Sequence, residues 1–448
     1  MRERNLARLR DEQFDVLVIG GGINGAGIAR DLVLRDPGIR VALVEKNHFA
    51  SGTSGKNSQL IHGGLRYLKY AEFHLVREAL RERSTLLAMS GGLVEPLEFL
   101  IPCYGLADRC FYRAGLALYD LLSGKHSIGH HRRVDPAMYE PGLARDALVF
   151  YDCKVNSARL VLETIIDAEA RGAAVANYVE AHVSGKTIEA FDALGGDRFA
   201  IRARKVVNAT GAWSGGGKLR LVRGSHLIFP RIQRGTEAIA FFDEHGRIVF
   251  LIPWGEAGDL TLVGTTDVDH EGSPDDVHIS DEETRYLTGI VRRLFPSYRG
   301  EPVSSYSALR PLIAEKGHSA TSTSREHSIW ETADGVLHIA GGKYTTYRAM
   351  SEELVDMLSP LPCVTASVPL KPGLRPDTRQ AVEREYARRL SDLLYVSTYW
   401  GYERPLSREW IEPLAREMGG LLDWDEATIA AEIARIPIPS RTPVQNPT

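Results

Sequence analysis

The sequence is poor in cysteine and lacks the patterns that hold metals or disulfides. Its 448 residues include four cysteines, at positions 103, 110, 153 and 363. None belongs to a CxxC pair, and none has a histidine at zinc-ligand spacing. We therefore expect no metal site and no disulfide scaffold, and the pattern indicates a reducing compartment.

Long apolar runs are also missing. No stretch approaches the roughly 18 apolar residues of a membrane-spanning helix, and the charged start, MRERNLARLRDEQFD, has no apolar secretory core. The apolar segment 110–122 is flanked by Arg109, Arg113 and Lys125. Such a helix is more often buried than laid into a membrane surface, and both interpretations stay open. We expect a cytoplasmic protein, with peripheral contact at the cytoplasmic face of the membrane as an option.

Neither sign of charge dominates. The formal net charge is −4, so the overall charge does not attract nucleic acid, and we expect the chain not to bind it. A local basic site for a small anion remains compatible with this balance. With 44% hydrophobic and 25% charged residues, the composition is typical of a globular protein of two or three domains.

What the sequence does contain is one strand–helix–strand unit near its start. Residues 15–20 (DVLVIG) and 40–45 (RVALVE) are short apolar runs that predict buried strands, and residues 23–35 between them predict a helix. Two buried strands joined by a helix are typical of a parallel α/β sheet. We therefore expect a Rossmann-like nucleotide-binding domain.

The turn after the first strand has the glycine spacing of a dinucleotide-binding loop. Gly20, Gly22 and Gly25 satisfy GxGxxG, and the second strand ends in Glu45, about 20 residues beyond the last glycine. Gly20 allows the tight turn, Gly22 lets the backbone approach a pyrophosphate, and Gly25 lets helix and strand pack closely. The pyrophosphate would lie at the helix N-terminus, and Glu45 would accept hydrogen bonds from the adenosine ribose.

Three features favour FAD over a nicotinamide nucleotide. Residues 205–211 (KVVNATG) predict a strand that ends in Ala209, Thr210 and Gly211 and packs back against the nucleotide domain. Residues 341–346 (GGKYTT) lie between a strand and a helix, whose N-terminus would stabilise a reduced flavin ring. No second GxGxxG is found in the sequence, so the electrons would come from the substrate itself.

The rest of the chain predicts two further parts. Residues 219–267 are rich in β-branched and aromatic residues, and residues 379–435 are mostly helical in pattern. The expected fold class is α/β: a Rossmann-like FAD-binding domain, a substrate domain on a mixed or antiparallel sheet, and a small C-terminal helical domain. The expected boundaries interleave FAD segments at 14–70, 150–215 and 335–360 with substrate segments at 71–149 and 216–334, followed by a linker at 371–378, the helical domain at 379–436 and a tail at 437–448.

Ordered motifs resemble those of the FAD-dependent glycerol-3-phosphate dehydrogenases, from about Asp15 to about Arg348 and more loosely beyond. The matching blocks are VIGGGINGAGIARD at 18–31, LIHGGLRYL at 60–68, ARLV at 158–161, NATGAW at 208–213, RGSH at 223–226, LVGTTD at 262–267, LRPL at 309–312, SREH at 324–327 and GGKYTTYR at 341–348. The resemblance implies an FAD enzyme that oxidises sn-glycerol 3-phosphate at C2 to dihydroxyacetone phosphate. Electrons would pass to quinone at the membrane or, in the oxidase branch of the family, to oxygen.

The resemblance also implies which residues bind the substrate. Arg310 and Arg325 match the arginines of LRPL and SREH and would bind the phosphate, which suits a guanidinium fork better than an ammonium group. Arg66 and Tyr67 would line the other side of the substrate. Lys343 would bind the substrate or neutralise the reduced flavin.

The proton acceptor for the C2 hydroxyl is expected to be His226, in the GSH block. A neutral imidazole suits that task near physiological pH. His62 is the rival base, and a purely structural His226 is the alternative, because a base is assigned by geometry. The expected catalytic set is therefore His226 with Arg310, Lys343 and Arg66.

Further cofactor contacts are expected from the glycine turn and three later loops. They are Asn24; Thr53, Ser54 and Ser58; His62, Gly63 and Gly64; and Gly342, Lys343, Thr345 and Thr346. Gly63 and Gly64 would permit close approach of the backbone to the flavin. The hydroxyl groups would donate to the FAD phosphates or ring, and ordinary helix capping is their alternative role.

The sequence departs from the family pattern at four places. Gln59 stands where the family commonly has a basic residue, and Tyr344 replaces the usual leucine of GGKLTTYR. The loop after Trp213 is reduced to SGGGK, and the C-terminal domain is short. These departures leave the nucleotide motif intact and bear on the cap, the acceptor site and the contact of an expected homodimer.

Two other functions fit part of the pattern. FAD-dependent amine or amino-acid oxidases share the expected fold, and Arg310 and Arg325 would then bind a carboxylate. A non-catalytic flavin-binding scaffold is the other alternative. Reduction of the flavin by glycerol 3-phosphate, by an amino acid or by neither separates the three.

Overall fold

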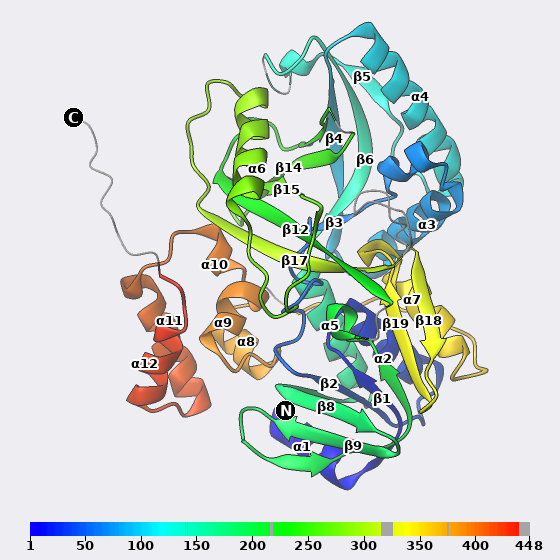
Figure 1. The fold of residues 1–448 in the computed structure, drawn as a ribbon, viewed down its shortest axis with the longest axis vertical. Helices are drawn as coiled ribbons and strands as arrows, with labels where there is room; N and C mark the ends of the chain where they lie inside the picture. The colour runs from blue at the N-terminus through cyan, green and yellow to red at the C-terminus, as the bar shows by residue number, and fades with distance from the viewer. Residues whose placement is uncertain are drawn as a thin grey trace.

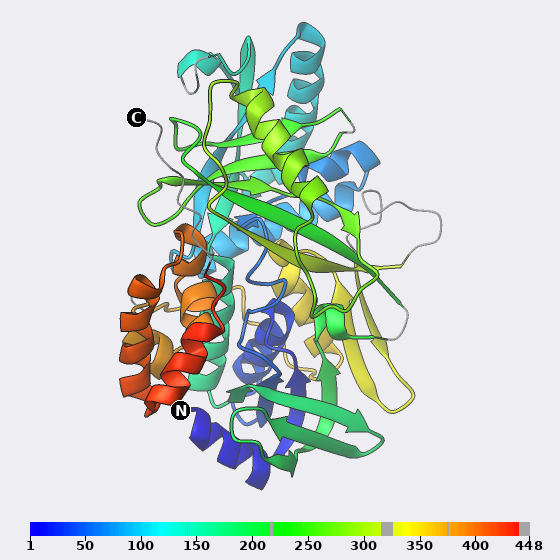
Figure 2. The same cartoon turned by 60° about the vertical axis from the view of Figure 1, so that its left-hand side comes forward.

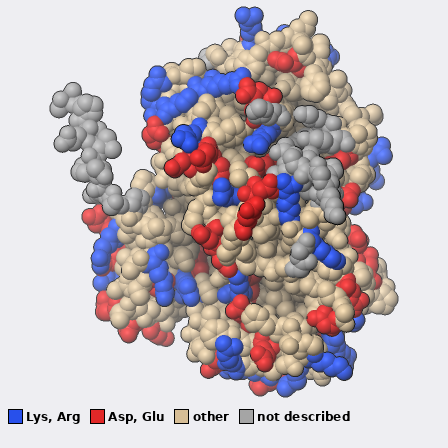
Figure 3. Space-filling model, viewed as in Figure 1, with Lys and Arg blue, Asp and Glu red and all other residues tan. Residues whose placement is uncertain are grey.

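Two sheets, one below the other along the long axis, form the body of the molecule (Figure 1). The computed structural model describes residues 1–138, 140, 142–215, 218–244, 246–314, 326–373 and 376–438, without the side chains of residues 66, 69 and 70. Basic and acidic side chains are interspersed over the face seen in Figure 3. The position of the two sheets matters for function because the candidate site lies between them.

The lower sheet carries the strand–helix–strand unit that the sequence predicts. Its strand order is β18-β19-β11-β1-β2-β7; the strands from β19 to β7 are parallel, and β18 is antiparallel to β19. In that order the strands span His327–Glu331, Val336–Gly341, Arg202–Asn208, Gln13–Ile19, Val41–Glu45 and Ala174–Asn177. Because β1 is central, the glycine turn that follows it opens at the carboxyl edge of the sheet, where open α/β sheets bind ligands.

Alternating apolar side chains of this sheet fill two cores. Val16 and Val18 belong to the cluster shared with α2, α5 and α7, whereas Leu17 packs with α1 and a small three-stranded sheet. The helices span Ile23–Arg35 (α2), Ser157–Ala170 (α5), Tyr347–Asp356 (α7) and Arg2–Asp11 (α1), and the small sheet contains β8 (Val179–Ser184), β9 (Thr187–Asp192) and β10 (Arg198–Ala200). The lower sheet is thus covered on both faces.

The upper sheet is mostly antiparallel. Its order is β16-β12-β15-β14-β13-β4-β6-β3, with β17 beside β12 and β5 beside β6, and β13 is parallel to β4. The strands span Val268–Asp269 (β16), Leu219–Pro230 (β12), Leu260–Gly264 (β15), Ile248–Trp254 (β14), Ala238–Phe242 (β13), Val94–Cys103 (β4), Asp146–Val155 (β6), Leu60–Ile61 (β3), Ser304–Ile313 (β17) and Arg132–Val134 (β5). The long strands β12 and β17 run toward the lower sheet (Figure 1).

Helices cover both faces of the upper sheet. On one face, Leu287 and Val291 of α6 (Asp281–Leu294) pack with Phe229, and a capping box of Ser280 and Glu283 begins this helix. On the other face lie α3 (Phe73–Met89) and α4 (Leu106–Ser123). Short 3₁₀ turns at Leu65–Tyr70, Gly124–His126, Pro136–Met138, Gly211–Trp213 and Tyr344–Thr346 join the larger elements.

The chain ends in a group of small helices beside both sheets (Figure 2). They are α8 (Thr378–Glu383), α9 (Leu390–Asp392), a π-helical turn at Leu393–Ser397, α10 (Trp400–Glu403), α11 (Arg408–Leu422) and α12 (Glu426–Ala434). Leu390, Leu394, Ile411 and Met418 are among the residues of a buried cluster of their own. We call residues 378–438 the C-terminal helical segment.

The helix α4 is more exposed than its apolar sequence suggests. Leu116 and Tyr119 are buried, but Leu106, Phe111 and Leu121 are 66%, 70% and 76% exposed. The commoner expectation, a buried helix, is therefore wrong for this face. None of the described helices is long and apolar enough to cross a membrane.

The expected fold class is confirmed, with its parallel nucleotide-binding sheet, mixed second sheet and C-terminal helices. The strands β4 and β6 of the second sheet were not predicted from the sequence. The interleaved domain boundaries stay a prediction.

Candidate active site

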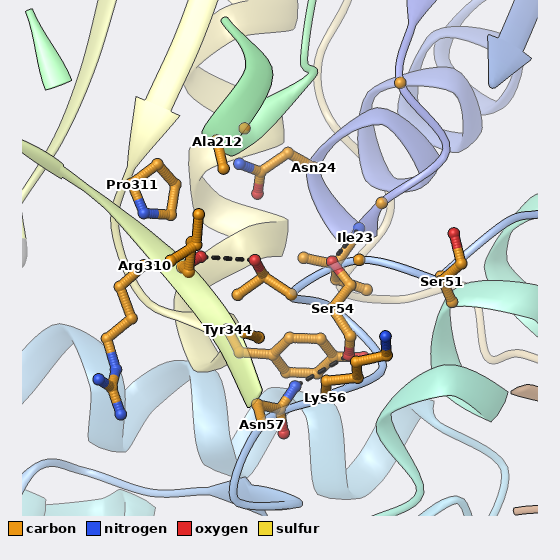
Figure 4. Close-up of a pocket in the computed structure, with 18 of the residues that line it drawn as sticks. Ile23, Asn24, Ser51, Ser54, Lys56, Asn57, Ala212, Arg310, Pro311 and Tyr344 are labelled. Carbon is orange, nitrogen blue, oxygen red and sulfur yellow. Dashed lines mark hydrogen bonds between the residues drawn. The ribbon is translucent and has the colours of Figure 1, made fainter. Parts of the chain in front are cut away.

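A cavity of ≈ 1090 Å³ opens between the sheets, at the carboxyl edge of β1 and β2. Its walls come from the glycine turn, the loop of residues 46–59 between β2 and β3, the strands β12 and β17, and the turn after β19. Figure 4 shows Asn24, Ser54, Arg310 and Tyr344 from these regions around one space. Segments far apart in the sequence therefore meet at one place.

The glycine turn has the backbone that a dinucleotide loop requires. Gly20 has a φ of +116°, and a Cβ there would lie 2.6 Å from the Ala209 carbonyl oxygen. A Cβ on Gly25 would collide with the Gly20 carbonyl oxygen. The helix α2 begins without a side-chain cap from Gly22, and its first N–H groups and dipole favour an anion.

Glu45 ends β2 at the same edge of the sheet. Its Oε2 accepts the Gly21 N–H at 2.7 Å, and its Oε1 accepts the Asn47 N–H at 2.8 Å. Burial raises the pKa of this carboxyl. Each carboxylate oxygen has a second lone pair. Glu45 can therefore hold the glycine turn and still accept hydrogen bonds from the hydroxyl groups of a ribose.

The loop of residues 46–59 is held in place by its hydroxyl groups. The Ile23 N–H donates to Ser54 Oγ at 3.0 Å, and Thr53 Oγ1 donates to the Leu309 carbonyl oxygen at 2.5 Å. Asn24, Ala209, Thr210 and Gly211 line the cavity as well. A positive-φ turn, a helix start and a terminal carboxylate on one wall fit the pyrophosphate and adenosine of FAD.

Arg310 stands on another wall of the cavity. It extends from β17 across Gly224 of β12, where a Cβ would collide with the guanidinium. Its Nη1 donates to the Thr266 carbonyl oxygen at 3.0 Å and to Asp267 Oδ1 at 2.9 Å, and its Nη2 donates to Thr265 Oγ1 at 2.9 Å. These bonds hold a guanidinium fork at a defined place on the wall.

Lys343 and Tyr67 come together although they are far apart in the sequence. Lys343 Nζ lies 3.7 Å from the centroid of the Tyr67 ring and donates to the Leu75 carbonyl oxygen at 3.3 Å. A cation over an aromatic face is stabilised by the ring quadrupole. Both residues, and Gly342 beside Lys343, line the cavity.

His226, the expected base, is buried on β12. Its Nε2 lies 2.9 Å from Ser58 Oγ, and its buried Nδ1 has no hydrogen-bond partner among the described residues. Burial, and then the positive charge of Arg310, lower the pKa of His226 to about 3. The ring is therefore neutral at physiological pH, but so low a pKa makes it a weak proton acceptor.

His62, the rival base, also lines the cavity. Thr345 Oγ1 accepts the His62 N–H at 3.1 Å and donates to the His62 carbonyl oxygen at 3.2 Å. Thr346 Oγ1 donates to the Lys343 carbonyl oxygen at 3.3 Å. Both threonines are buried and bonded within the protein, and neither lines the cavity. Their expected contact with the cofactor stays a prediction.

The two glycines after His62 differ from one another. A Cβ on Gly63 would collide with the Tyr119 hydroxyl, and the Gly63 N–H donates to Asp152 Oδ1 at 3.1 Å. Gly63 thus packs closely inside the protein, and its expected approach to a flavin stays a prediction. Gly64 has a φ of +80° and lines the cavity, as expected.

Two expected substrate ligands lie outside what the structure describes. Arg325 is not among the described residues, and only the backbone is described for Arg66. Their roles therefore stay predictions that rest on the resemblance to the family.

Lys56 also lines the cavity, although it was not predicted from the sequence. Figure 4 shows Lys56 near Ser54 and Tyr344, and burial lowers its pKa. A signal was present, because Lys56 belongs to the same short loop as Thr53 and Ser58.

The C-terminal helical segment was also not expected to reach the site. Its residues Arg389, Ser391 and Asp392 line the cavity near Tyr178. The Tyr178 hydroxyl donates to Asp392 Oδ1 at 2.6 Å across 214 positions of sequence, and the Arg389 guanidinium lies 4.8 Å from the Tyr178 ring centroid. No local sequence pattern predicts contacts between residues so far apart in the chain.

Comparison with known proteins agrees with this geometry. The family described as FAD dependent oxidoreductase matches residues 15–357. The glycerol-3-phosphate dehydrogenase of Synechocystis is 38% identical over an alignment of 424 positions, gaps included, and the match covers 83% of this chain and 75% of that protein. That of Pseudomonas aeruginosa is 34% identical over an alignment of 447 positions, gaps included, and the match covers 92% of this chain and 84% of that protein.

Solved structures give the same result. The glycerol-3-phosphate dehydrogenase of Bacillus halodurans, complexed with FAD, aligns with a TM-score of 0.76 and 25% identity over 97% of this chain and 95% of its own. A glycine oxidase from Geobacillus kaustophilus aligns with a TM-score of 0.60 and 20% identity, over 81% of this chain and 99% of its own, and shows the fold alone. The chain belongs to the FAD-dependent oxidoreductases and, among them, to the FAD-dependent glycerol-3-phosphate dehydrogenase family.

Proposed function

We propose that this protein oxidises sn-glycerol 3-phosphate at C2 to dihydroxyacetone phosphate, with FAD as the cofactor that accepts the hydride. The observation that carries the proposal is a single cavity with a dinucleotide-binding turn on one wall and the fixed cations Arg310 and Lys343 on others. Fixed cations match a phosphate monoester. The relatives named glycerol-3-phosphate dehydrogenase support the same substrate.

Among the described residues, Arg310 is the one proposed to bind the phosphate of the substrate. Its bonds to Thr265, Thr266 and Asp267 orient the guanidinium before the substrate arrives, so less side-chain entropy is lost on binding. Arg325 and Arg66 are proposed to add to this site. Lys343, held over Tyr67, is proposed to bind the substrate or to offset negative charge on the reduced cofactor.

The C2 hydroxyl must give up its proton as the hydride leaves, and two histidines of the cavity are candidates to take it. Burial and the charge of Arg310 lower the pKa of His226 to about 3, which makes His226 a weak proton acceptor. We therefore place His62 first and His226 second. Replacing the true base with asparagine should lower kcat by about 10²–10⁴, and the same change at the other histidine should cost less.

The test is anaerobic reduction of the purified, FAD-containing protein. sn-Glycerol 3-phosphate should bleach the visible flavin band, whereas glycerol, which lacks the phosphate, should not. Bleaching by glycine or another amino acid, and not by glycerol 3-phosphate, would establish an amine or amino-acid oxidase instead. Bound FAD that none of these compounds reduces would establish a flavin-binding scaffold without turnover.

We further propose that the electrons pass to a membrane quinone, with α4 resting on the bilayer surface. The exposed apolar side chains of Leu106, Phe111 and Leu121 support this placement, as do Arg109 and Arg113 on the same helix. α4 lies at the outer edge of the upper sheet (Figures 1 and 2).

Two measurements test the acceptor and the surface. A soluble quinone should reoxidise the reduced protein faster than oxygen does; the reverse would identify an oxidase. Phe111→Ser combined with Leu121→Ser should weaken sedimentation with anionic phospholipid vesicles, while Leu361→Ser, an exposed leucine beyond α7, should not. A homodimer remains a prediction that sedimentation of the free protein can check.

A further inference from the structure

The C-terminal helical segment docks on α5 through buried charges. Arg384 donates to both carboxylate oxygens of Glu163, at 2.7 and 2.5 Å, and Arg159 lies 2.7 Å from the same carboxylate. Arg159 also pairs with Glu385. Glu163 and Glu385 are fully buried. Removing one partner of such a network leaves an uncompensated charge, so the segment has one defined position on α5.

From this position the segment places Tyr399 beneath the loop of residues 46–59. The buried Tyr399 hydroxyl donates to the Gly55 carbonyl oxygen at 2.7 Å and accepts the Ala158 N–H at the start of α5 at 3.2 Å. Gly55 directly follows Ser54, whose Oγ accepts the Ile23 N–H at the start of α2. One hydroxyl thus joins the C-terminal helical segment, α5 and the loop that faces the nucleotide site.

Gln59 completes the same junction. This residue has a positive φ of +56°, and its side chain is buried. Its Oε1 accepts the Ser157 N–H at 2.9 Å, and its Nε2 donates to the Gly55 carbonyl oxygen at 3.3 Å and to the Tyr399 hydroxyl at 3.4 Å. An uncharged amide at position 59 can bridge these partners, which a basic side chain could not do because it has no acceptor.

A second contact lies along the same cavity. Asp392 accepts the Tyr178 hydroxyl at 2.6 Å and the Arg388 and Arg389 N–H groups at 2.8 and 3.0 Å. Arg389 and Asp392 also line the cavity. The segment therefore touches the cofactor site at two places, through Tyr399 under the loop and through Arg389 and Asp392 in the wall.

We propose that the docked C-terminal helical segment is a coupled part of the FAD site, with Tyr399 as a positioning residue for the loop of residues 46–59. If FAD binds best to the docked arrangement, then docking strengthens FAD binding and FAD strengthens docking by the same factor, because coupling between sites is reciprocal. The inference rests on the proposed use of FAD but not on the proposed substrate.

The first test compares two single-hydroxyl deletions in one aromatic cluster. Tyr399→Phe removes the junction and keeps the ring, whereas Tyr395→Phe removes a hydroxyl with no hydrogen-bond partner among the described residues. Titration of the apoprotein with FAD, followed by flavin fluorescence, should show a Kd about 3- to 30-fold higher for Tyr399→Phe, the range of one lost buried hydrogen bond. Tyr395→Phe should leave it unchanged. An unchanged FAD Kd for Tyr399→Phe, whatever happens to its melting temperature, would overturn the positioning role.

The second test uses the unmodified chain. Amide hydrogen exchange in residues 378–438 should slow when FAD is added, and Tyr399→Phe should reduce that protection. Equal exchange with and without FAD would overturn the coupling. Neither measurement uses glycerol 3-phosphate, so a failure here is distinct from a failure of the proposed reaction.

Discussion

The two ends of the cavity are built in different ways. The nucleotide end takes its turn, helix start and carboxylate from Gly20 to Glu45, a stretch that folds as one strand–helix–strand unit. The end with Arg310 and Lys343 is assembled from β12, β17 and the turns after β3 and β19, which only the tertiary fold brings together. A local site can be recognised from spacing, whereas an assembled site needs the fold.

The largest effect, a loss of bound FAD, is expected from adding a single Cβ to the glycine turn. Gly25→Ala should yield protein that purifies with little or no FAD, because the added Cβ collides with the Gly20 carbonyl oxygen and displaces the turn. Gly115→Ala in α4, where a Cβ would have open space, is the matched control. The ratio of flavin to protein absorbance measures the result, and a full complement of FAD in Gly25→Ala would contradict the assigned turn.

A substitution at the end of the cavity with Arg310 and Lys343 should change KM and leave the FAD content unchanged. Arg310→Ala should raise KM for glycerol 3-phosphate by about 30- to 4000-fold, the equivalent of 2–5 kcal/mol for a lost charge pair, while bound FAD stays the same. Arg220→Ala is the control, since Arg220 of β12 also forms an ion pair, with Asp269 of β16, but does not line the cavity. Steady-state kinetics measures both, and an unchanged KM would remove Arg310 from the phosphate site.

At the end of the cavity with Arg310, the buried His226 should make the free energy of unfolding depend on pH. His226 has a folded-state pKa of about 3, below its ordinary value near 6.5, so below pH 6.5 the unfolded chain binds a proton that the folded chain refuses. The free energy of unfolding should therefore fall as pH drops, by up to about 2 kcal/mol between pH 6.5 and 5 for this residue. Urea unfolding at both pH values gives the free energy of unfolding of the wild type and of His226→Asn. If this free energy changed equally with pH in the two proteins, the lowered pKa of His226 would be contradicted.

The smallest effect is expected for a single hydroxyl at the local site. Ser54→Ala removes the acceptor of the Ile23 N–H and should weaken FAD binding by about 3- to 10-fold. Ser51→Ala changes another serine that lines the cavity and should have less effect. FAD titration of the apoproteins compares them, and a larger loss for Ser51→Ala would place the cofactor differently.

The sequence predicts more of the molecule where structure is local. The helix at 23–35 matches α2 residue for residue, because the periodic apolar residues that predict a helix lie in the segment itself. The strands β4 and β6 were missed, since their partners lie elsewhere in the chain. The hydrogen-bond partners of Thr345 and Thr346 within the protein were not predicted, because the direction of a side chain depends on its neighbours in space.

The sequence by itself determined the dinucleotide turn, the class of cofactor and the family, because each depends on residue types at short, fixed spacings. Only the tertiary structure decided that Arg310 is held across Gly224, that His226 is buried against Ser58, and that Tyr399 reaches Gly55. The physical reason is the separation along the sequence over which each kind of interaction acts. Backbone conformation and periodicity act over a few residues, whereas burial, pKa and hydrogen-bond partners depend on side chains that the fold brings from hundreds of positions away.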